Sequence, residues 1–381
     1  MSAHILIDKM QEVQKELLNY LDEENDAALN FQDLLTIFEK NKIKENFVDL
    51  KLFLRLLINI SNYHKRGPGF FNKIEQILNF FKEEIQNNFT NYDIFNFSKI
   101  SKRILLYFIK EKMVIIDKVM AKNLIDKDHT KECYPYYFYP EIKPFINDII
   151  DQKTPKWIQY FSTGIPENFE ENRKIGENEH YICELIRKDL VDDFIIYTNK
   201  TNLQLDSLII GSIYETHPEL VREIPDNEYS LFLQPSLIEY AAFFGSIQIF
   251  QYLRLNGVEI KKTILGYAIF GNNPEIIHII EEARIMPKKE SFNDCLFNSI
   301  QCHHNEIANY LIENKNIKFI CKKDCFQYYN FQMIQSEDIN ESNLVSFCKY
   351  DYSEFLRFYL NTNKSFDINK IINIQKSSIS I

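Results

Sequence analysis

The sequence lacks the short motifs that hold phosphate groups or catalytic side chains, and glycine is scarce, with 9 in 381 residues. The glycine-rich stretch Gly67-Pro68-Gly69 has no strand before it and no Lys followed by Ser or Thr after it, so it predicts a turn. No HExxH pattern and no nucleophile elbow occur. The 8 histidines are scattered, and no Ser/His/Asp or Cys/His arrangement stands out. We therefore expect a protein without catalytic activity and without a cofactor.

Long apolar runs are also absent. The best two, Leu52 to Ile60 and Ile104 to Ile109, are shorter than the roughly 20 residues that a membrane-spanning helix needs. Residues 1–9 have neither the cationic nor the apolar region of a signal peptide. The 7 cysteines have no paired spacing, which is typical of a reducing compartment. These features predict a cytoplasmic protein without a membrane span, with a nuclear location as the alternative.

An excess of positive charge is missing as well, because the formal net charge is -10. Residues 1–160 have equal numbers of basic and acidic side chains, so the whole acidic excess lies in residues 161–381. Acidic surfaces repel phosphate backbones, so we expect no nucleic-acid partner. The hydrophobic fraction of 45%, with 31 Phe and 22 Tyr, is ample for a core and excludes a disordered chain.

Helical periodicity is what the first third of the sequence contains instead. Apolar residues recur at helical spacing in six stretches, near residues 5–21, 34–38, 45–60, 70–85, 98–108 and 114–124. Asp26 is expected to cap the second helix, and Ser98 to open the fifth. Since β-type alternation is almost absent, the pattern predicts an all-α domain, either a bundle or a solenoid of diverged repeats.

Residues 133–176 interrupt this pattern. The segment CYPYYFYPEIKPF, at residues 133–145, contains three prolines and cannot form one continuous helix. Two interpretations are open: an exposed aromatic binding strip, or a linker packed between two halves of the protein. We favour the packed linker, because exposed apolar runs are uncommon in monomers. Trp157, the single tryptophan, is expected at the same junction.

The stretch from Ser236 to Ile260, SLIEYAAFFGSIQIFQYLRLNGVEI, predicts a helix–turn–helix unit. Its Ala-Ala pair allows the first helix to lie close to a neighbour, and Gly245 provides the positive φ with which one helix turns back on the next. The apolar stripe of the second helix is formed by Ile249, Phe250 and Leu253. One such unit cannot bury that stripe alone, so similar units should flank it.

The same register recurs on both sides of this unit. With Gly245 as the turn position, the equivalent positions are Asp189, Glu215, Gly271, Cys302 and Tyr350. The long gap between the last two leaves room for one further degenerate unit or an insertion. The units resemble ankyrin repeats. Most of the spacings are shorter than the roughly 33 residues usual for that repeat, so we expect short or missing β-hairpins between the units.

The chain resembles a large family of ankyrin-repeat proteins from trichomonad protists, which join a helical N-terminal region of unknown function to degenerate ankyrin units. Besides the unit around Gly245, the resemblance is carried by YICELIRKDLVDD (residues 181–193), YAIFGNNPEIIHII (267–280) and SIQCHHNEIANYLI (299–312). The sequence departs from ordinary ankyrin units in lacking Thr-Pro-Leu-His, and Cys302 and Tyr350 stand where glycine is usual. The resemblance implies a fold but assigns no activity and no functional residues.

We therefore predict an all-α protein with a helical N-terminal domain followed by a degenerate ankyrin-repeat solenoid of about six units. The predicted boundaries are 1–132 for the helical domain, 133–176 for the linker, 177–362 for the repeats and 363–381 for a capping or frayed tail.

The predicted function is that of a scaffold or adaptor that binds a protein partner, because ankyrin arrays bind through their first helices and the loops between units. The expected contact residues are exposed positions on the first helices: Glu239, Phe243, Phe270, Asn298 and Gln301. In the alternative interpretation, the aromatic members of this set pack internally. A further hypothesis places the partner site in the N-terminal helical domain.

A zinc-stabilised or metal-dependent domain, centred on Cys302 to Cys325, is the alternative function. The residue types that suit zinc there are Cys295, Cys302, His303, His304, Cys321 and Cys325. Their spacing fits no standard zinc knuckle, and the repeat register already accounts for Cys302 and His303 as turn residues. The favoured interpretation therefore has no bound metal.

Overall fold

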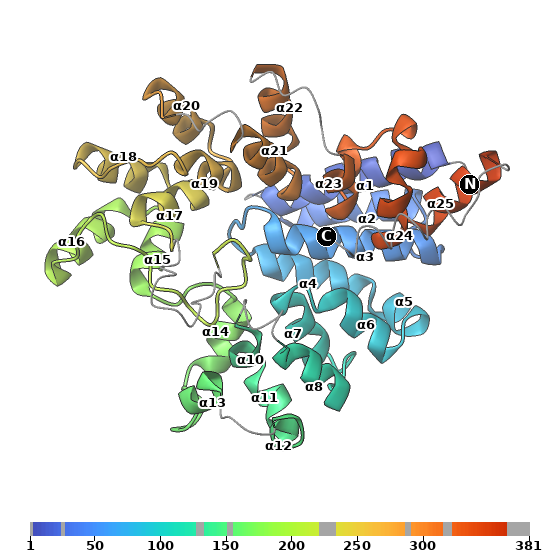
Figure 1. The fold of residues 1–381 in the computed structure, drawn as a ribbon, viewed down its shortest axis with the longest axis horizontal. Helices are drawn as coiled ribbons and strands as arrows, with labels where there is room; N and C mark the ends of the chain where they lie inside the picture. The colour runs from blue at the N-terminus through green and yellow to red at the C-terminus, as the bar shows by residue number, and fades with distance from the viewer. Residues whose placement is uncertain are drawn as a thin grey trace. The chain divides into compact units, whose positions relative to one another are not determined.

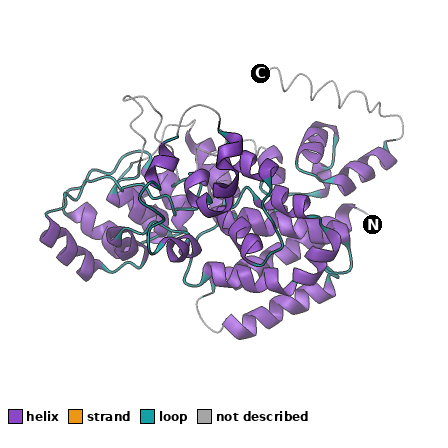
Figure 2. Ribbon diagram, turned by 90° about the horizontal axis from the view of Figure 1, so that it is seen from below, coloured by secondary structure: helices purple, strands orange, loops and turns teal. Residues whose placement is uncertain are grey.

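The fold is helical wherever the chain is described. The structure, a computed structural model, describes residues 3–23, 27–126, 133–150, 155–220, 234–285, 291–314 and 322–363. In these ranges the regular secondary structure is α-helix or 3-10 helix, and the only β-type pairing is an isolated antiparallel bridge between Leu208 and Ser236 (Figure 2). None of these helices is both long and apolar enough to cross a membrane. The predicted all-α class is confirmed.

The chain folds into two compact units, and each contains segments that are distant in sequence. The first unit consists of residues 1–60, 64–84 and 288–381, and the second of residues 61–63 and 85–287. The predicted domain boundaries at residues 132 and 176 both lie inside the second unit. The predicted repeat region is divided near residue 287.

The first unit combines N-terminal and C-terminal helices. The N-terminal ones are α1 (Ala3–Asp22), α2 (Ala27–Lys40), α3 (Phe47–Tyr63) up to Ile60, and α4 (Phe70–Phe80). The C-terminal elements are α21 (Ser291–Gln301), α22 (Asn305–Asn314), α23 (Lys322–Gln327), η2 (Phe331–Met333), η3 (Ser336–Asp338), η4 (Glu341–Asn343), α24 (Leu344–Lys349) and α25 (Ser353–Thr362). α1 packs against α2 and α4 and also against η2, η3 and α25 (Figure 1).

The amphipathic pattern of α1 accounts for this packing. Leu6, Met10, Val13 and Leu17 recur at helical spacing and are buried, as predicted. Ile5, which the same pattern included, is 54% exposed because it lies on the opposite side of the helix.

Several helix boundaries between residues 70 and 125 differ from the predicted ones. The stretch 70–85 is divided at Phe81 into α4 and α5 (Lys82–Asn88), and the sequence pattern does not predict α6 (Asn91–Ser98). A capping box of Thr90 and Asp93 starts α6. The helix predicted to open at Ser98 is α7 (Lys102–Lys110), which Ser101 caps, and α8 is Lys118–Ile125. Asp26, the predicted cap of the second helix, lies outside the described residues.

Short helices replace the predicted linker in the second unit. They are α10 (Tyr134–Tyr137), α11 (Tyr139–Ile142), η1 (Lys143–Phe145), α12 (Ile146–Ile149), α13 (Lys156–Tyr160) and α14 (Phe169–Ile175). Proline lies at the first or second position of α10, α11 and η1, because it can start a helix but cannot continue one. Tyr134, Tyr137, Phe138 and Tyr139 are buried, so the aromatic segment is packed and is not an exposed strip.

Three helix pairs follow in the second unit: α15 (Tyr181–Arg187) with α16 (Val191–Thr201), α17 (Leu237–Phe244) with α18 (Ile247–Leu255), and α19 (Ile264–Gly271) with α20 (Pro274–Glu282). The first helices pack on each other, α15 on α17 and α17 on α19. The second helices do the same, α16 on α18 and α18 on α20 (Figure 1). The predicted stripe of α18, formed by Ile249, Phe250 and Leu253, is fully buried.

Each pair turns through one residue with positive φ. The residues with this geometry between the helices of a pair are Asp189, Gly245, Asn272, His303 and Asp351, of which the last two lie in the first unit. At three turns the left-handed residue is therefore one position after the predicted Gly271, Cys302 and Tyr350. Asn, Asp and His enter the left-handed region more readily than other residues with a Cβ, which explains why glycine is not required there.

Two other predicted repeat positions have no complete helix pair among the described residues. Residues 203–220, around the predicted turn at Glu215, contain turns and bends but no helix. In the gap between Cys302 and Tyr350, α23 is followed by a left-handed turn at Tyr329, but the next elements are the 3-10 turns η2, η3 and η4 and not a second helix of a pair.

α17 and α19 approach each other at backbone distance through two glycines. A Cβ on Gly245 would lie 2.7 Å from the carbonyl oxygen of Gly271. A Cβ on Gly271 would lie 2.7 Å from the backbone nitrogen of Gly245 and closer still to the carbonyl oxygen of Ala242. Asn273 Nδ2 adds a hydrogen bond to the Gly245 carbonyl at 2.9 Å. This contact needs glycine on both helices.

The substitution Gly271→Ala tests this contact, because higher helix propensity would raise the stability of the protein whereas a clash of the new methyl group with the backbone would lower it. Helix propensity alone would stabilise the protein by roughly 1 kcal/mol. The added methyl group, however, meets backbone atoms that cannot rotate away, so we expect a net loss of about 2 kcal/mol in the free energy of unfolding, measured by urea denaturation. In the control, Gly67→Ala, a Cβ meets nothing within 4 Å, and we expect little change. An unchanged or increased stability of Gly271→Ala would contradict the close approach.

Candidate functional site: a buried polar cluster around Arg187

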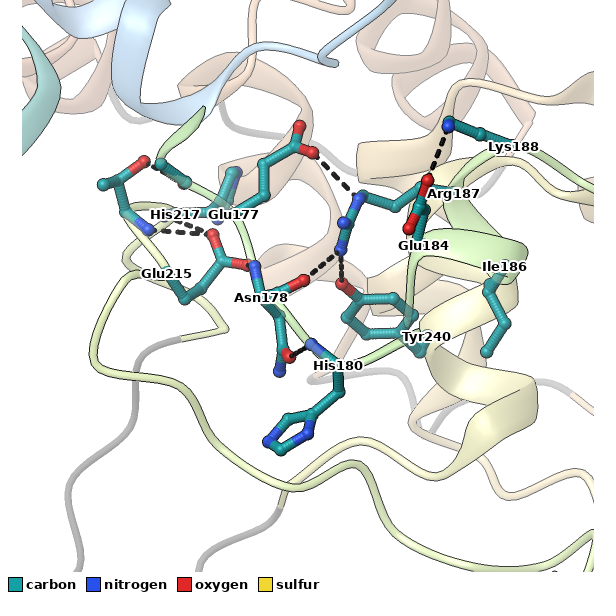
Figure 3. Close-up of polar contacts among 12 residues, drawn as sticks. Glu177, Asn178, His180, Glu184, Ile186, Arg187, Lys188, Glu215, His217 and Tyr240 are labelled. Atoms are coloured by element: carbon teal, nitrogen blue, oxygen red, sulfur yellow. Dashed lines mark hydrogen bonds and ion pairs between the residues drawn. The ribbon is translucent and has the colours of Figure 1, made fainter. Parts of the chain in front are cut away.

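A buried polar cluster lies where the first helix pair of the second unit meets the loops on either side of it (Figure 3). Arg187 is the last residue of α15, and Tyr240 lies in the middle of α17. The segment before α15 contributes Glu177 and Asn178, and the loop after α16 contributes Glu215. Residues from four chain segments therefore meet at one place.

Arg187 is the centre of the cluster. Its Nε lies 2.8 Å from Glu177 Oε2, and its Nη1 donates to the Asn178 carbonyl at 2.9 Å and to the Tyr240 hydroxyl at 3.0 Å (Figure 3). Burial on its own lowers the pKa of Arg187, but the neighbouring Tyr240 and Glu177 raise that pKa above its ordinary value. The guanidinium is therefore a fixed positive charge that orients three neighbours at once.

Glu215 is held by backbone N–H groups. One carboxylate oxygen accepts from the nitrogens of Thr216 at 2.9 Å and His217 at 2.8 Å, and the other accepts from the nitrogen of Asn178 at 3.3 Å. The Glu215 carbonyl accepts from Lys102 Nζ at 2.7 Å. Glu215 is buried, and these bonds fix the loop after α16 against the start of α15.

The hydroxyl and thiol of the cluster are poorly suited to proton transfer near neutral pH. Burial raises the pKa of the Tyr240 hydroxyl well above its ordinary value, and burial raises the pKa of the neighbouring Cys183 thiol to about 12. A general base or a nucleophile works best when its pKa is close to the operating pH. The contacts of the cluster instead support a positioning role, in which it holds one loop on the first helices.

That loop brings His217 onto two of the predicted partner-contact residues. The His217 ring lies edge-on to Phe243 and Phe270, with ring centroids 4.7 Å and 5.4 Å away. The two phenylalanine rings are stacked on each other at 5.2 Å. Phe243 and Phe270 are consequently buried under a segment of their own chain.

The other predicted contact residues are engaged in similar ways. Glu239 accepts from the Ser236 nitrogen and hydroxyl at 2.9 Å and 2.8 Å, and from the Thr263 hydroxyl at 2.7 Å. Gln301, in the first unit, donates to the Tyr328 hydroxyl at 3.2 Å. Asn298, also in the first unit, is half-buried.

The predicted exposure is therefore wrong for Glu239, Phe243, Phe270 and Gln301, all of which are buried. The alternative interpretation, internal packing of the aromatic members, describes both phenylalanines. Three of the five residues, Glu239, Phe243 and Phe270, belong to the second unit, and Asn298 and Gln301 belong to the first.

Sequence reasoning does not find the Arg187 cluster. Its members are spread from Glu177 to Tyr240 and share no spacing motif. The one hint in the sequence is Arg187, a charged residue that directly follows the apolar residues of α15. This hint is not specific, because a basic residue is also common at helix ends that are exposed to water.

The described residues do not form the predicted alternative, a metal site around Cys302. Among them, no three His, Cys, Asp or Glu side chains are placed to hold a metal ion. Cys295, Cys302 and Cys325 are buried, and Cys302 Sγ lies 3.2 Å from His304 Nδ1. Cys321 lies outside the described residues.

Comparison with protein-family models gives a match over part of the chain. The model of a domain of unknown function (DUF3447) matches residues 255–336, which include the helix pairs α19/α20 and α21/α22. No curated protein matches the chain, and no solved structure matches it.

Replacing Arg187 by methionine should be strongly destabilising, because it removes the ion pair with Glu177 and the hydrogen bond to the Asn178 carbonyl. Breaking a buried pair typically costs about 3–5 kcal/mol, and since Arg187 keeps 12% side-chain exposure we expect about 3 kcal/mol. Urea denaturation gives the value. Arg254→Met, at an exposed position of α18, is the matched control and should change stability little. Equal effects of both substitutions would contradict the role of the cluster.

Cysteine labelling tests the burial of the core. At pH 8 the native protein should leave Cys183 and Cys295 unmodified by iodoacetamide, because burial raises the pKa of both thiols to about 12 and the thiolate is the reactive form. Cys133 and Cys348 are only partly buried and should react first. Peptide mass spectrometry of protein labelled in buffer and in urea distinguishes the two classes. Rapid labelling of Cys183 in buffer would show that α15 is not packed as described.

Proposed function

We propose that this chain is a protein-binding scaffold or adaptor, without catalytic activity, built on ankyrin-like helix pairs. The observation that carries this proposal is the stacking of α15/α16, α17/α18 and α19/α20, first helix on first helix and second on second. Stacked helix pairs are the architecture of repeat proteins, whose extended surfaces serve mainly to bind other proteins.

Recurrent turn geometry supports the ankyrin-like interpretation. In the second unit, the nitrogen of Leu190 donates to the Leu185 carbonyl at 3.0 Å, and Ser246 donates to Ala241 at 2.9 Å. In the first unit, the equivalent bonds join His304 to Ser299 at 3.0 Å and Tyr352 to Phe347 at 2.9 Å. Each of these hydrogen bonds encloses a residue with positive φ between two helices, so the same turn conformation recurs at all four turns.

The surface that we assign to the partner differs from the first-helix positions expected from the sequence. α15 and α16 form the first pair of the stack. Tyr181 on α15, Leu190 in the turn between the two helices and Ile196 on α16 are large apolar residues with 51%, 41% and 64% of their surface exposed. End units of solenoids usually present a polar outer face, so exposed apolar side chains on the end pair favour a binding role. The excess of acidic residues in 161–381 favours a protein rather than a nucleic acid as the partner.

A charge placed on this surface tests the proposal. We expect Ile196→Lys to weaken partner binding by about tenfold or more, because the loss of a central apolar contact typically costs about 2 kcal/mol. Proteins captured by the full chain from its own cells would be identified by mass spectrometry, purified, and titrated against the wild type and the variant.

Ile115→Lys is the matched control, since Ile115 is 71% exposed at a different place in the second unit. It should bind like the wild type, and both variants should unfold at the same urea concentration as the wild type. Equal binding by both variants would rule out the α15/α16 surface. The absence of any partner that binds the purified chain directly would count against the scaffold function itself.

A further inference from the structure

Three of the 8 histidines form one buried cluster in the first unit. His64 follows the last residue of α3, and His303 and His304 form the turn between α21 and α22. Their exposed fractions are 1%, 3% and 5%, and the ring centroids of His64 and His304 are 5.0 Å apart. The cluster therefore links chain segments that are 238 residues apart in sequence.

His64 faces two acceptors. Its Nδ1 lies 2.7 Å from the Cys302 carbonyl oxygen, and its Nε2 lies 2.7 Å from Asp22 Oδ1. A carbonyl oxygen only accepts, and so does an ionised carboxylate. Burial opposes ionisation of Asp22, but the hydrogen bond and charge of His64 lower the pKa of that carboxyl below its usual value. Both ring nitrogens of His64 therefore face acceptors, and each contact is a hydrogen bond when that nitrogen has a proton.

His303 faces a donor instead. Gln14 Oε1 accepts from the Gln332 nitrogen at 3.1 Å, which directs Gln14 Nε2 to the other side. There Nε2 lies 2.9 Å from His303 Nδ1 and 2.9 Å from Asn330 Oδ1. An amide NH₂ only donates, so His303 Nδ1 is the acceptor and has no proton. If His303 Nδ1 took up a proton, its N–H would point at the N–H of Gln14 Nε2, and the hydrogen bond between them would be lost.

Other titratable groups surround the cluster. α1 contributes Asp22, Lys65 follows His64, and α4 contributes Lys73, whose Nζ donates to the Tyr20 carbonyl at the end of α1 at 2.9 Å. The α21–α22 turn contributes Cys302 and His304. The backbone of Tyr328, which follows α23, is hydrogen-bonded to His303 and by itself raises the pKa of His303. Burial raises the pKa of the Cys302 thiol, which leaves it neutral. The charged neighbours of the cluster are thus one carboxylate and two lysines, and burial makes a positive charge at His303 unfavourable.

We propose that this histidine cluster is an acid-sensitive clasp within the first unit, closed while His303 is neutral and opened when His303 takes up a proton. In the closed state Gln14 on α1 binds His303, Asn330 and the Gln332 backbone at one point, next to the hydrogen bonds from Gln11 to the Phe331 and Ile334 carbonyls. The His303 ring is therefore the pH-sensitive member of the contacts that join α1 to the C-terminal elements. Opening separates α1 from η2 and from the α21–α22 turn, and it exposes the face of α1 that packs on these elements. The clasp is independent of the proposed scaffold function.

The direction of the pH dependence follows from where the proton binds. Burial, and then the charges of His64 and His304, hold the pKa of His303 well below its usual value of 6.5. Below that pH the unfolded or opened chain takes up a proton that the closed form does not, so the closed form is favoured above pH 6.5 and is lost as the pH falls. Asp22 acts in a separate window, since its lowered pKa affects stability only below about pH 4.

Hydrogen exchange of the full chain between pH 7.5 and 5, corrected for intrinsic rates, tests the clasp. We expect α1 and α21–α25 to lose protection below pH 6.5, by up to about tenfold for each pH unit, because one proton is taken up. Helices α15–α20 should keep their protection over the same range. A loss spread evenly over both units would overturn the proposal.

Two variants separate the clasp from general acid sensitivity. His303→Asn does not titrate and tolerates the left-handed φ of 63° at this position, so it should remove the pH dependence of protection in α1 and α21–α25. His278→Gln, at an exposed position of α20, should leave the wild-type pH dependence unchanged. If His303→Asn retains the wild-type profile, the proposal is wrong.

Histidine NMR of the wild-type protein gives a test that needs no variant. In the closed state the His303 ring should remain neutral until the pH at which protection is lost. Observation of a protonated His303 in the fully protected protein would overturn the proposal, even where His303→Asn is unstable.

Discussion

Backbone contact between α17 and α19 is the constraint on which the second unit depends. Because neither Gly245 nor Gly271 has a Cβ, the backbones of α17 and α19 come into direct contact at these two residues. This spacing stacks the rings of Phe243 and Phe270, and the stacked rings form the surface on which His217 lies. If α17 and α19 were further apart, the backbone contact, the stacking of Phe243 on Phe270 and the contact of His217 with these rings would be lost. The tightly packed side chains of a protein interior cannot adjust to a larger distance between helices.

The covered first helices have a consequence for function. In a regular ankyrin array the first helices and the loops between units are open to a partner. Here the loop after α16 occupies that place on α17 and α19, and the polar cluster around Arg187 and Glu215 holds the loop there with buried, charge-assisted hydrogen bonds. In the proposed scaffold function, a partner would therefore bind a different surface of the second unit from the one used in a regular array, and we propose the exposed apolar side chains of α15, α16 and the turn between them as that surface.

Both units use buried polar groups for the same physical task, which is to join segments that are distant in sequence. Arg187 and Glu215 do so in the second unit, and His64, His303 and Gln14 in the first. Apolar contacts between helices tolerate small shifts in register, whereas a buried hydrogen bond loses most of its energy when its donor is misaligned. Such groups therefore fix which segments pair, and they respond to pH where one of them is a histidine.

The sequence by itself determined the all-helical class, the buried stripes of α1 and α18, and most of the turns, because these features follow from residues fewer than about ten positions apart. Even there, the left-handed residue fell one position after Gly271, Cys302 and Tyr350, since Asn, His and Asp can replace glycine. Only the tertiary structure decided the composition of the two units, the burial of Phe243 and Phe270, and the members of the Arg187 and histidine clusters. These features depend on which segments, distant in sequence, pack against each other. The free energy of that packing is a sum over many contacts, and no local sequence pattern encodes it.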